Sequence, residues 1–191
     1  MRIGVVGGGV YGTAVAYFLT EFGATDVTLF EAERIASGST GYSAGIVRHH
    51  YTNEVQIRMA KRGREILERL PDYVGHDGGF HRNGYLILPA PDELDEFRRT
   101  VERQRKLGVD VELVDPDELA DHLPAISPAD VEVGAFERTA GFADPYLVAS
   151  GFAEAARENG ADVHTGTPVT DLHAEDGTVT AVETPDGRHR V

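Results

Sequence analysis

The sequence predicts an α/β protein whose core is a β-α-β unit with parallel strands. Three observations predict it: a β-branched run at residues 2–7, three glycines in the pattern G-x-G-x-x-G at its end, and an apolar helical pattern after them. A second strand-like run follows at residues 26–31. This glycine pattern is typical of a dinucleotide-binding turn only between a strand and a helix. The opening of the chain meets that condition.

The first elements follow one another closely. The stretch RIGVVG reads as a buried parallel strand, and the apolar residues from 10 to 19 recur at helical spacing until Gly23 ends the helix. The stretch DVTLFE supplies the second strand and ends in Glu31, nineteen residues after Gly12. An acid at about this distance completes the Rossmann-like pattern.

Each residue of the pattern has a physical task. Gly7 allows the tight strand-to-helix turn, Gly9 lets the backbone approach a pyrophosphate, and Gly12 lets helix and strand pack closely. The helix N-terminus offers N–H groups and a partial positive charge to the phosphates. Glu31 can accept the hydroxyls of an adenosine ribose, and it would repel the 2′-phosphate of NADP.

The stretch AERIASGSTGYSAGIVRHHYTNE, residues 32–54, is rich in glycine and hydroxyl side chains between Ala36 and Gly45. Such a loop can surround a second phosphate or the polar edge of a flavin. Its composition fits a disordered surface loop about equally well.

Composition narrows the function classes. The 191 residues include 41% apolar residues and no cysteine, which excludes disulfides and thiolate chemistry. The formal net charge is −14, and it is uneven: residues 1–70 carry 8 basic and 7 acidic groups, and residues 71–191 carry 10 and 25. An acidic surface repels nucleic acid and anionic membranes. It fits either a halophilic, salt-rich cytoplasm or an ordinary acidic surface.

No stretch resembles a membrane span or a signal peptide, so we expect a cytoplasmic protein that uses neither nucleic acid nor membrane as a partner. The adjacent histidines His49 and His50 would point to opposite faces of an extended segment, so we expect no metal site.

The remaining elements are expected in this order: a helix over 54–70 ended by Pro71, a strand pair around Asn83-Gly84, a helix within 91–108, a short helix from Pro116 capped by Asp115, a helix over 144–159, a third parallel strand at 161–166, and a β-ribbon over 168–184 with its turn at Asp176-Gly177. The expected domains are residues 1–77 and 140–191, as two segments of a dinucleotide-binding domain, and an inserted α+β region at 78–139.

Four stretches resemble the FAD-dependent amine and amino-acid oxidoreductases typified by D-amino-acid oxidase, glycine oxidase, sarcosine oxidase and dimethylglycine dehydrogenase. They are VVGGGVYGTAVAYFL, VTLFEAERIASGSTGYSAGIVRHHY, NGYLILPA and GFADPYLVASGFAEAARENGADVHTGTPVTDL, and they occur in family order. The resemblance implies an FAD-binding domain, a partial substrate or cap domain at 78–139, and oxidation of a C–N bond by hydride transfer to the flavin.

The resemblance also implies site residues. It assigns Arg48 to the substrate carboxylate, where a guanidinium fork can bind both oxygens. Tyr42 stands where dimethylglycine dehydrogenases carry a flavin-linked histidine, so we expect non-covalent FAD; Gly45 replaces a second arginine of sarcosine oxidases. The expected cofactor contacts are Gly7, Gly9, Val10, Tyr11, Gly12, Glu31, Ala32, Ser39, Thr40, Ser43, Ala44, Gly45 and Val169.

The expected substrate is an amino acid or a secondary or N-methylated amine such as sarcosine or dimethylglycine. Two alternatives remain open: an NAD-dependent dehydrogenase, which leaves residues 36–48 unexplained, and a non-catalytic dinucleotide-binding fragment or subunit. Family members are about twice as long as this chain. We therefore expect the chain alone to bind FAD weakly or not at all, to show no turnover, and to form a homo-oligomer or join a partner chain.

Overall fold

The glycine-rich opening folds into a strand, a turn and a helix in a computed structural model that describes residues 1–125, 127 and 131–191. Strand β1 (Ile3–Val6) leads through the turn into α1 (Val10–Glu21), and β2 (Val27–Phe30) follows. Gly23 ends α1 at a φ of +91°, which favours glycine. Strand β8 (Asp162–His164) completes a parallel sheet in the order β1-β2-β8. The predicted β-α-β unit and its third parallel strand are confirmed.

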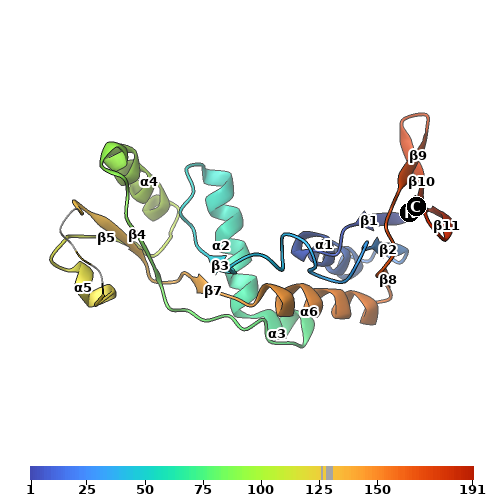
Figure 1. Cartoon of the computed structure of the whole chain (residues 1–191), viewed down its shortest axis with the longest axis horizontal. Helices are drawn as coiled ribbons and strands as arrows, with labels where there is room; N and C mark the ends of the chain where they lie inside the picture. The colour runs from blue at the N-terminus through green and yellow to red at the C-terminus, as the bar shows by residue number, and fades with distance from the viewer. Residues whose placement is uncertain (126, 128–130) are drawn as a thin grey trace. The chain divides into compact units, whose positions relative to one another are not determined.

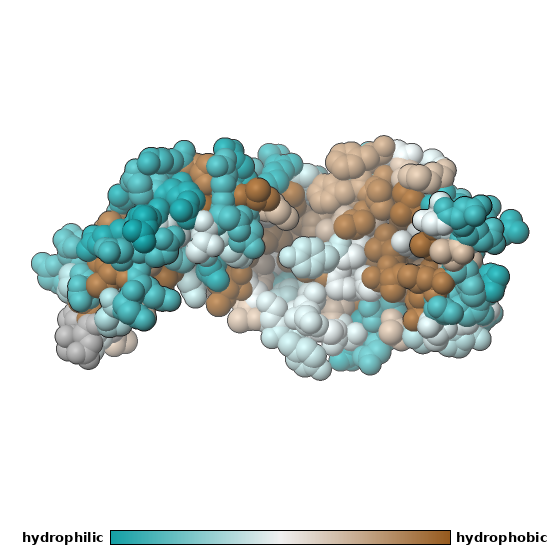
Figure 2. Space-filling model, turned by 90° about the horizontal axis from the view of Figure 1, so that it is seen from above, coloured by the Kyte–Doolittle hydropathy of each residue, from teal (hydrophilic) through white to brown (hydrophobic). Residues whose placement is uncertain are grey.

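The chain divides into two compact units. The first unit comprises Met1–Gly45, Arg69–Gly79 and Asp144–Val191, and the second comprises Ile46–Glu68 and Phe80–Ala143. These bounds differ from the expected domains chiefly at residues 46–68, which group with the inserted region. Apolar residues gather over the first unit, whereas the second unit is mostly hydrophilic on the face shown in Figure 2.

Helices α1 and α6 (Pro145–Glu158) pack side by side in the first unit (Figure 1). Small buried residues such as Ala16 and Ala149 allow this approach, and the ring of Phe152 lies 5.5 Å from that of Tyr17. The Asp144 side chain caps α6 by accepting the N–H groups of the first turn. Helix α3 (Leu70–Val74) also packs on α6.

A three-stranded antiparallel ribbon ends the first unit. Strands β9 (Asp171–Glu175) and β10 (Thr178–Thr184) meet at the predicted Asp176-Gly177 turn, and β11 (Gly187–Arg190) adds an unpredicted third strand.

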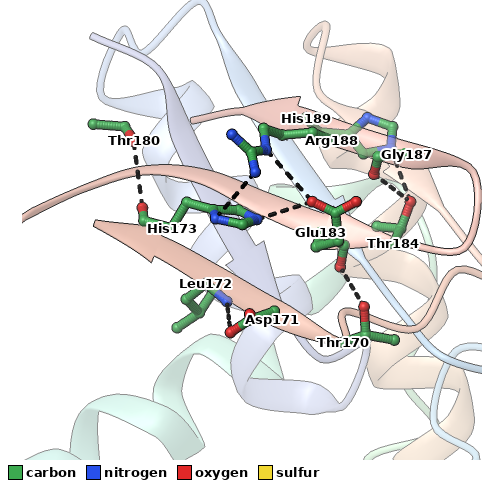
Figure 3. A network of polar contacts seen from close by, with 10 residues as sticks. All are labelled: Thr170, Asp171, Leu172, His173, Thr180, Glu183, Thr184, Gly187, Arg188 and His189. Atoms are coloured by element: carbon green, nitrogen blue, oxygen red, sulfur yellow. Dashed lines mark hydrogen bonds and ion pairs between the residues drawn. The ribbon is translucent and has the colours of Figure 1, made fainter. Parts of the chain in front are cut away.

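The Glu183 carboxylate on β10 joins the three strands of the ribbon. It lies 2.9 Å from His173 Nε2 and accepts a hydrogen bond from Arg188 Nε at 3.4 Å (Figure 3). The contact with His173 and the charge of Arg188 together lower the pKa of the Glu183 carboxyl.

The second unit is an antiparallel sheet covered by helices. The sheet order is β4-β6-β5, and β3 and β7 form a separate two-stranded antiparallel pair. The core is formed by Ile57, Phe97, Val101, Val109, Val111, Val133 and Ala135. The element bounds are β3 (Ile46–Val47), α2 (Glu54–Glu68), β4 (Tyr85–Ile87), the 3-10 helix η1 (Pro91–Glu93), α4 (Leu94–Lys106), β5 (Val111–Val114), α5 (Leu119–His122), β6 (Gly134–Glu137) and β7 (Gly141–Phe142).

The strand pair expected around Asn83-Gly84 is wrong. Strand β4 pairs with β6, and His81 forms a bridge with Phe142, so both halves of the stretch pair with distant segments. Gly84 bends the chain at a φ of +75°, and an added Cβ would lie 2.2 Å from the Phe136 ring.

Two predicted helix bounds also change. Helix α2 ends at Glu68, and Pro71 lies in the first turn of α3 rather than stopping the preceding helix, a position that proline favours. Helix α5 begins at Leu119 after Glu118, without the side-chain cap expected from Asp115.

A buried carboxylate lies in the second unit. Glu137 is fully buried, and its Oε2 accepts the His49 N–H at 2.7 Å while its Oε1 accepts Gln104 Nε2 at 2.6 Å. The His49 ring nitrogen Nδ1 lies 3.2 Å from the same Oε2. Burial acts to raise the pKa of Glu137, but the hydrogen bonds from His49 and Gln104 outweigh it and hold that pKa below its usual value.

Replacing Gly12 by alanine should destabilise the first unit, because a Cβ there would lie 1.8 Å from the Gly7 carbonyl oxygen. We expect the free energy of unfolding to fall by about 1–3 kcal/mol or more. Gly63→Ala is the matched control, since no atom lies within 4 Å of its added Cβ. That variant should gain about 0.5–1 kcal/mol. Urea unfolding followed by circular dichroism measures both, and equal stability of the two variants would contradict this packing argument.

Glu137→Gln should lower the free energy of unfolding by about 1–3 kcal/mol near neutral pH. A glutamine amide has a single, uncharged acceptor oxygen, so it cannot accept hydrogen bonds from both the His49 N–H and Gln104 as the two oxygens of the carboxylate do. The folded pKa lies below the unfolded one, so the stabilisation by ionised Glu137 is present above about pH 4.5 and is lost as the pH falls through the folded pKa. The stability gap between wild type and variant should therefore narrow in acid. The control Glu102→Gln removes an exposed carboxylate of α4 and should show little gap at either pH.

Candidate functional site

A pocket lies where β1 passes into α1. Its volume is about 350 Å³, and all of its residues belong to the first unit. We call it the glycine-turn pocket. It is lined by Val6, Gly7, Gly9, Val10, Tyr11, Gly12, Glu31, Ser37, Gly38, Ser39 and Thr40.

The glycines make the turn possible for different reasons. Gly7 has a φ of +105°, which other residues rarely adopt. Gly12 lies against the Gly7 carbonyl, and Gly9 faces Thr40, whose Oγ1 would be 3.0 Å from an added Cβ. Gly8, which the sequence pattern leaves variable, is equally constrained, because its Cβ would lie 2.8 Å from Ile35 Cδ1.

The loop after β2 returns to the glycine turn. The Thr40 hydroxyl accepts the Val10 N–H at 3.0 Å, and the Ala36 N–H donates to the Gly8 carbonyl oxygen at 3.0 Å. Ala36 adopts a φ of +62° to make this return. Residues 37–40 thus form one wall of the pocket and are held there by hydrogen bonds. For this part of the loop, the alternative of a disordered surface loop is wrong.

Glu31 connects the sheet to both loops. Its Oε2 accepts the Gly8 N–H at 2.6 Å, and its Oε1 accepts the Glu33 N–H at 2.8 Å and the Ser37 hydroxyl at 3.3 Å. An ionised carboxylate has about four acceptor positions, so about one remains for a ligand hydroxyl. The backbone carbonyl of Glu31 also accepts the Thr167 N–H at 2.8 Å.

The residues present fit the ADP half of a dinucleotide. The first turn of α1 lines the pocket, carries no acidic side chain, and has N–H groups that lack intrahelical partners. A side chain at Gly9 would enter the space beside Thr40 where a pyrophosphate has to approach. Glu31, at the end of the neighbouring strand, supplies the acceptor for a ribose.

Eight of the predicted cofactor residues meet in this pocket: Gly7, Gly9, Val10, Tyr11, Gly12, Glu31, Ser39 and Thr40. Five others do not line it: Ala32, Ser43, Ala44, Gly45 and Val169. Ser43 instead accepts the Gly45 N–H at 3.0 Å. Three lining residues were not predicted as cofactor contacts, namely Val6, Ser37 and Gly38. Only the small size of residues 37 and 38, in a loop rich in glycine and hydroxyl side chains, could have indicated them from the sequence.

Arg48 lies in the second unit, just after β3. Its Nη1 donates to the His50 carbonyl oxygen, and the guanidinium carbon lies 5.1 Å from the centre of the Tyr51 ring. The next residue, His49, is bound by Glu137 through both its N–H and its ring. The backbone that carries Arg48 is therefore attached to the core of its unit.

Comparisons with known proteins identify the family of the chain. A sequence profile of the family described as FAD dependent oxidoreductase matches residues 2–191. The mitochondrial pyruvate dehydrogenase phosphatase regulatory subunit of Mus musculus is 32% identical over 98% of this chain and 21% of that protein. The mitochondrial dimethylglycine dehydrogenase of Homo sapiens is 29% identical over 97% of this chain and 22% of that protein.

Among solved structures, L-proline dehydrogenase from P. horikoshii superposes with a TM-score of 0.90 at 31% identity, over 99% of this chain and 50% of that chain. The chain thus spans about a fifth of the length of the two curated relatives. Among the described residues, no helix is both long and apolar enough to cross a membrane. With a family profile that covers nearly its whole length, the chain belongs to the FAD-dependent oxidoreductases.

Proposed function

We propose that this chain is the N-terminal part of an oxidoreductase that binds FAD non-covalently and oxidises the C–N bond of an amino acid or of a secondary or N-methylated amine. The glycine-turn pocket carries the proposal, because its loop, its helix N-terminus and its acid line one pocket whose residues fit the ADP half of FAD. The L-proline and dimethylglycine dehydrogenases among the relatives support a secondary or methylated amino acid as substrate.

In this proposal the chain binds and orients while FAD, when bound, accepts the hydride. The first turn of α1 holds the diphosphate, and Glu31 holds the adenosine ribose. The negative charge of Glu31 would repel the 2′-phosphate of NADP, so NADP is disfavoured. The first unit then acts as the FAD-binding part and the second unit as part of a substrate domain.

Arg48 is the residue that we assign to the substrate carboxylate. A guanidinium binds a carboxylate with two parallel hydrogen bonds, which would fix the orientation of the Cα–N bond. Its contacts with the Tyr51 ring and the His50 carbonyl restrict its rotamers before substrate arrives. Less conformational freedom is then lost on binding.

A second candidate is a non-catalytic dinucleotide-binding subunit. The relative from Mus musculus that is called a regulatory subunit favours it. Both candidates use the same pocket, but only the oxidoreductase turns over a small-molecule substrate. A homo-oligomer or a partner chain is expected for either candidate. The assay that separates the two candidates uses the FAD-loaded longer protein of which this chain would be the N-terminal part, with sarcosine, dimethylglycine or proline and an artificial electron acceptor. Turnover supports the oxidoreductase, and FAD binding without turnover supports the subunit.

Glu31→Gln should weaken FAD binding by about 1.5–3 kcal/mol, because a charged hydrogen bond to the ribose is lost. Glu33→Gln is the matched control: this exposed neighbour carries the same charge but does not line the pocket. The affinity is measured by flavin fluorescence during titration of the 191-residue protein with FAD. Acid precipitation of the loaded protein should release the flavin into solution, as expected for non-covalent binding. Equal affinities of both variants would place the ribose contact elsewhere.

Arg48→Lys, made in the FAD-loaded longer protein that contains this chain, should lower kcat/KM for sarcosine by about tenfold to a hundredfold, because one ammonium cannot replace a bidentate fork. Dimethylamine, which has no carboxylate, should react equally well with wild type and variant. Arg58→Lys, on the exposed side of α2 and paired with Glu54, is the control. Equal loss with both substrates would show that Arg48 supports the fold rather than the carboxylate.

A further inference from the structure

A second pocket lies entirely within the second unit, at the start of α4. Its volume is about 180 Å³. We call it the His50 pocket. It is lined by His50, Thr52, Glu93, Glu96, Phe97 and Thr100.

His50 connects this pocket to the buried carboxylate. Its ring packs on Phe97 with centroids 5.3 Å apart, and its Nδ1 is buried without a hydrogen bond. The Oε1 of the fully buried Gln104 is likewise buried and unpaired, while the Nε2 of the same side chain donates to Glu137. Burial lowers the pKa of His50 and Arg48 adds to this, against smaller opposing effects of Glu137 and Gln104, so the ring is neutral at neutral pH.

The two carboxylates of the pocket differ in what they bind. Glu96 accepts a hydrogen bond from Arg99 at 2.9 Å and lies 3.9 Å from Arg103. Glu93 is exposed and forms no ion pair within the described part of the chain. One carboxylate that lines the pocket therefore has no cationic partner among the described residues.

We propose that the His50 pocket binds a small primary or secondary alkylammonium ion. In this proposal the neutral His50 ring keeps its proton on the buried Nδ1, so Nε2 is the acceptor for an N–H of the ligand. Glu93 supplies the opposite charge, and the Phe97 ring offers a face to the N-alkyl groups.

Other ligands fit this chemistry less well. An anion would meet two carboxylates and a neutral imidazole. A metal ion lacks ligands here, because no group of three histidine or acidic side chains suited to one occurs in the described ranges. A quaternary ammonium has the charge but no N–H to donate. The volume of about 180 Å³ admits an ion of the size of dimethylammonium. The site needs no FAD and does not rest on the proposed function.

The test is a titration of the isotope-labelled 191-residue protein with dimethylammonium chloride at constant ionic strength, followed by NMR of the His50 ring nitrogens. We expect a saturable shift at Nε2, with the proton of the free protein on Nδ1. Tetramethylammonium should bind about tenfold more weakly, because it lacks the N–H donor. An unsaturable response, or equal binding of both cations, would overturn the proposal.

Two variants separate the pocket from the general acidity of the chain. Glu93→Gln should weaken dimethylammonium binding by about tenfold. Asp95→Asn removes the same charge from the same exposed turn, outside the pocket, and should leave the affinity unchanged. Equal weakening by both variants would mean non-specific attraction to the acidic surface and would refute a defined site.

Discussion

The first unit depends on the close approach of α1 to the turn that precedes it. The Gly7 carbonyl occupies the space where any side chain at residue 12 would begin. This contact lets the helix start directly at the end of β1, so that its first turn opens beside the end of β2. Glu31 and Thr40 can then both bond to the same short stretch of backbone. The start of the helix and the shape of the pocket therefore depend on the missing Cβ of Gly12, together with the constraints at Gly7 and Gly8.

The second unit is organised around a charge instead. A buried carboxylate is unfavourable unless its acceptors are satisfied, and Glu137 meets that requirement with donors from His49 and Gln104. These donors belong to an extended segment and to α4, and Glu137 itself belongs to β6. The network works as a whole, since removal of one member leaves the others buried and unpaired. Arg48 and His50 flank the segment that it holds.

Local signals predicted the parts of the fold in which local and distant preferences agree. The strand, glycine turn, helix and acid of the opening stretch all favour one structure, so the α/β class and most of the pocket could be read from the sequence. Asn83-Gly84 carries an equally strong turn signal, but pairing of β4 with β6, about fifty residues away, overrides it. The order of the loop after β2 was undecidable, because it depends on the Thr40–Val10 bond. Glu137 gave no signal, since nothing in its own stretch shows that His49 and Gln104 converge on it.

The Glu31 carboxylate already accepts three hydrogen bonds from its own chain. The acid that is typical of nucleotide-binding sequences thus also stabilises the glycine turn and the loop after β2 in the absence of a ligand. A descendant that had given up its cofactor would still lose stability on losing this side chain. Selection for folding alone would then preserve the acid and the glycines around it. The signature can outlive the activity for which it is known.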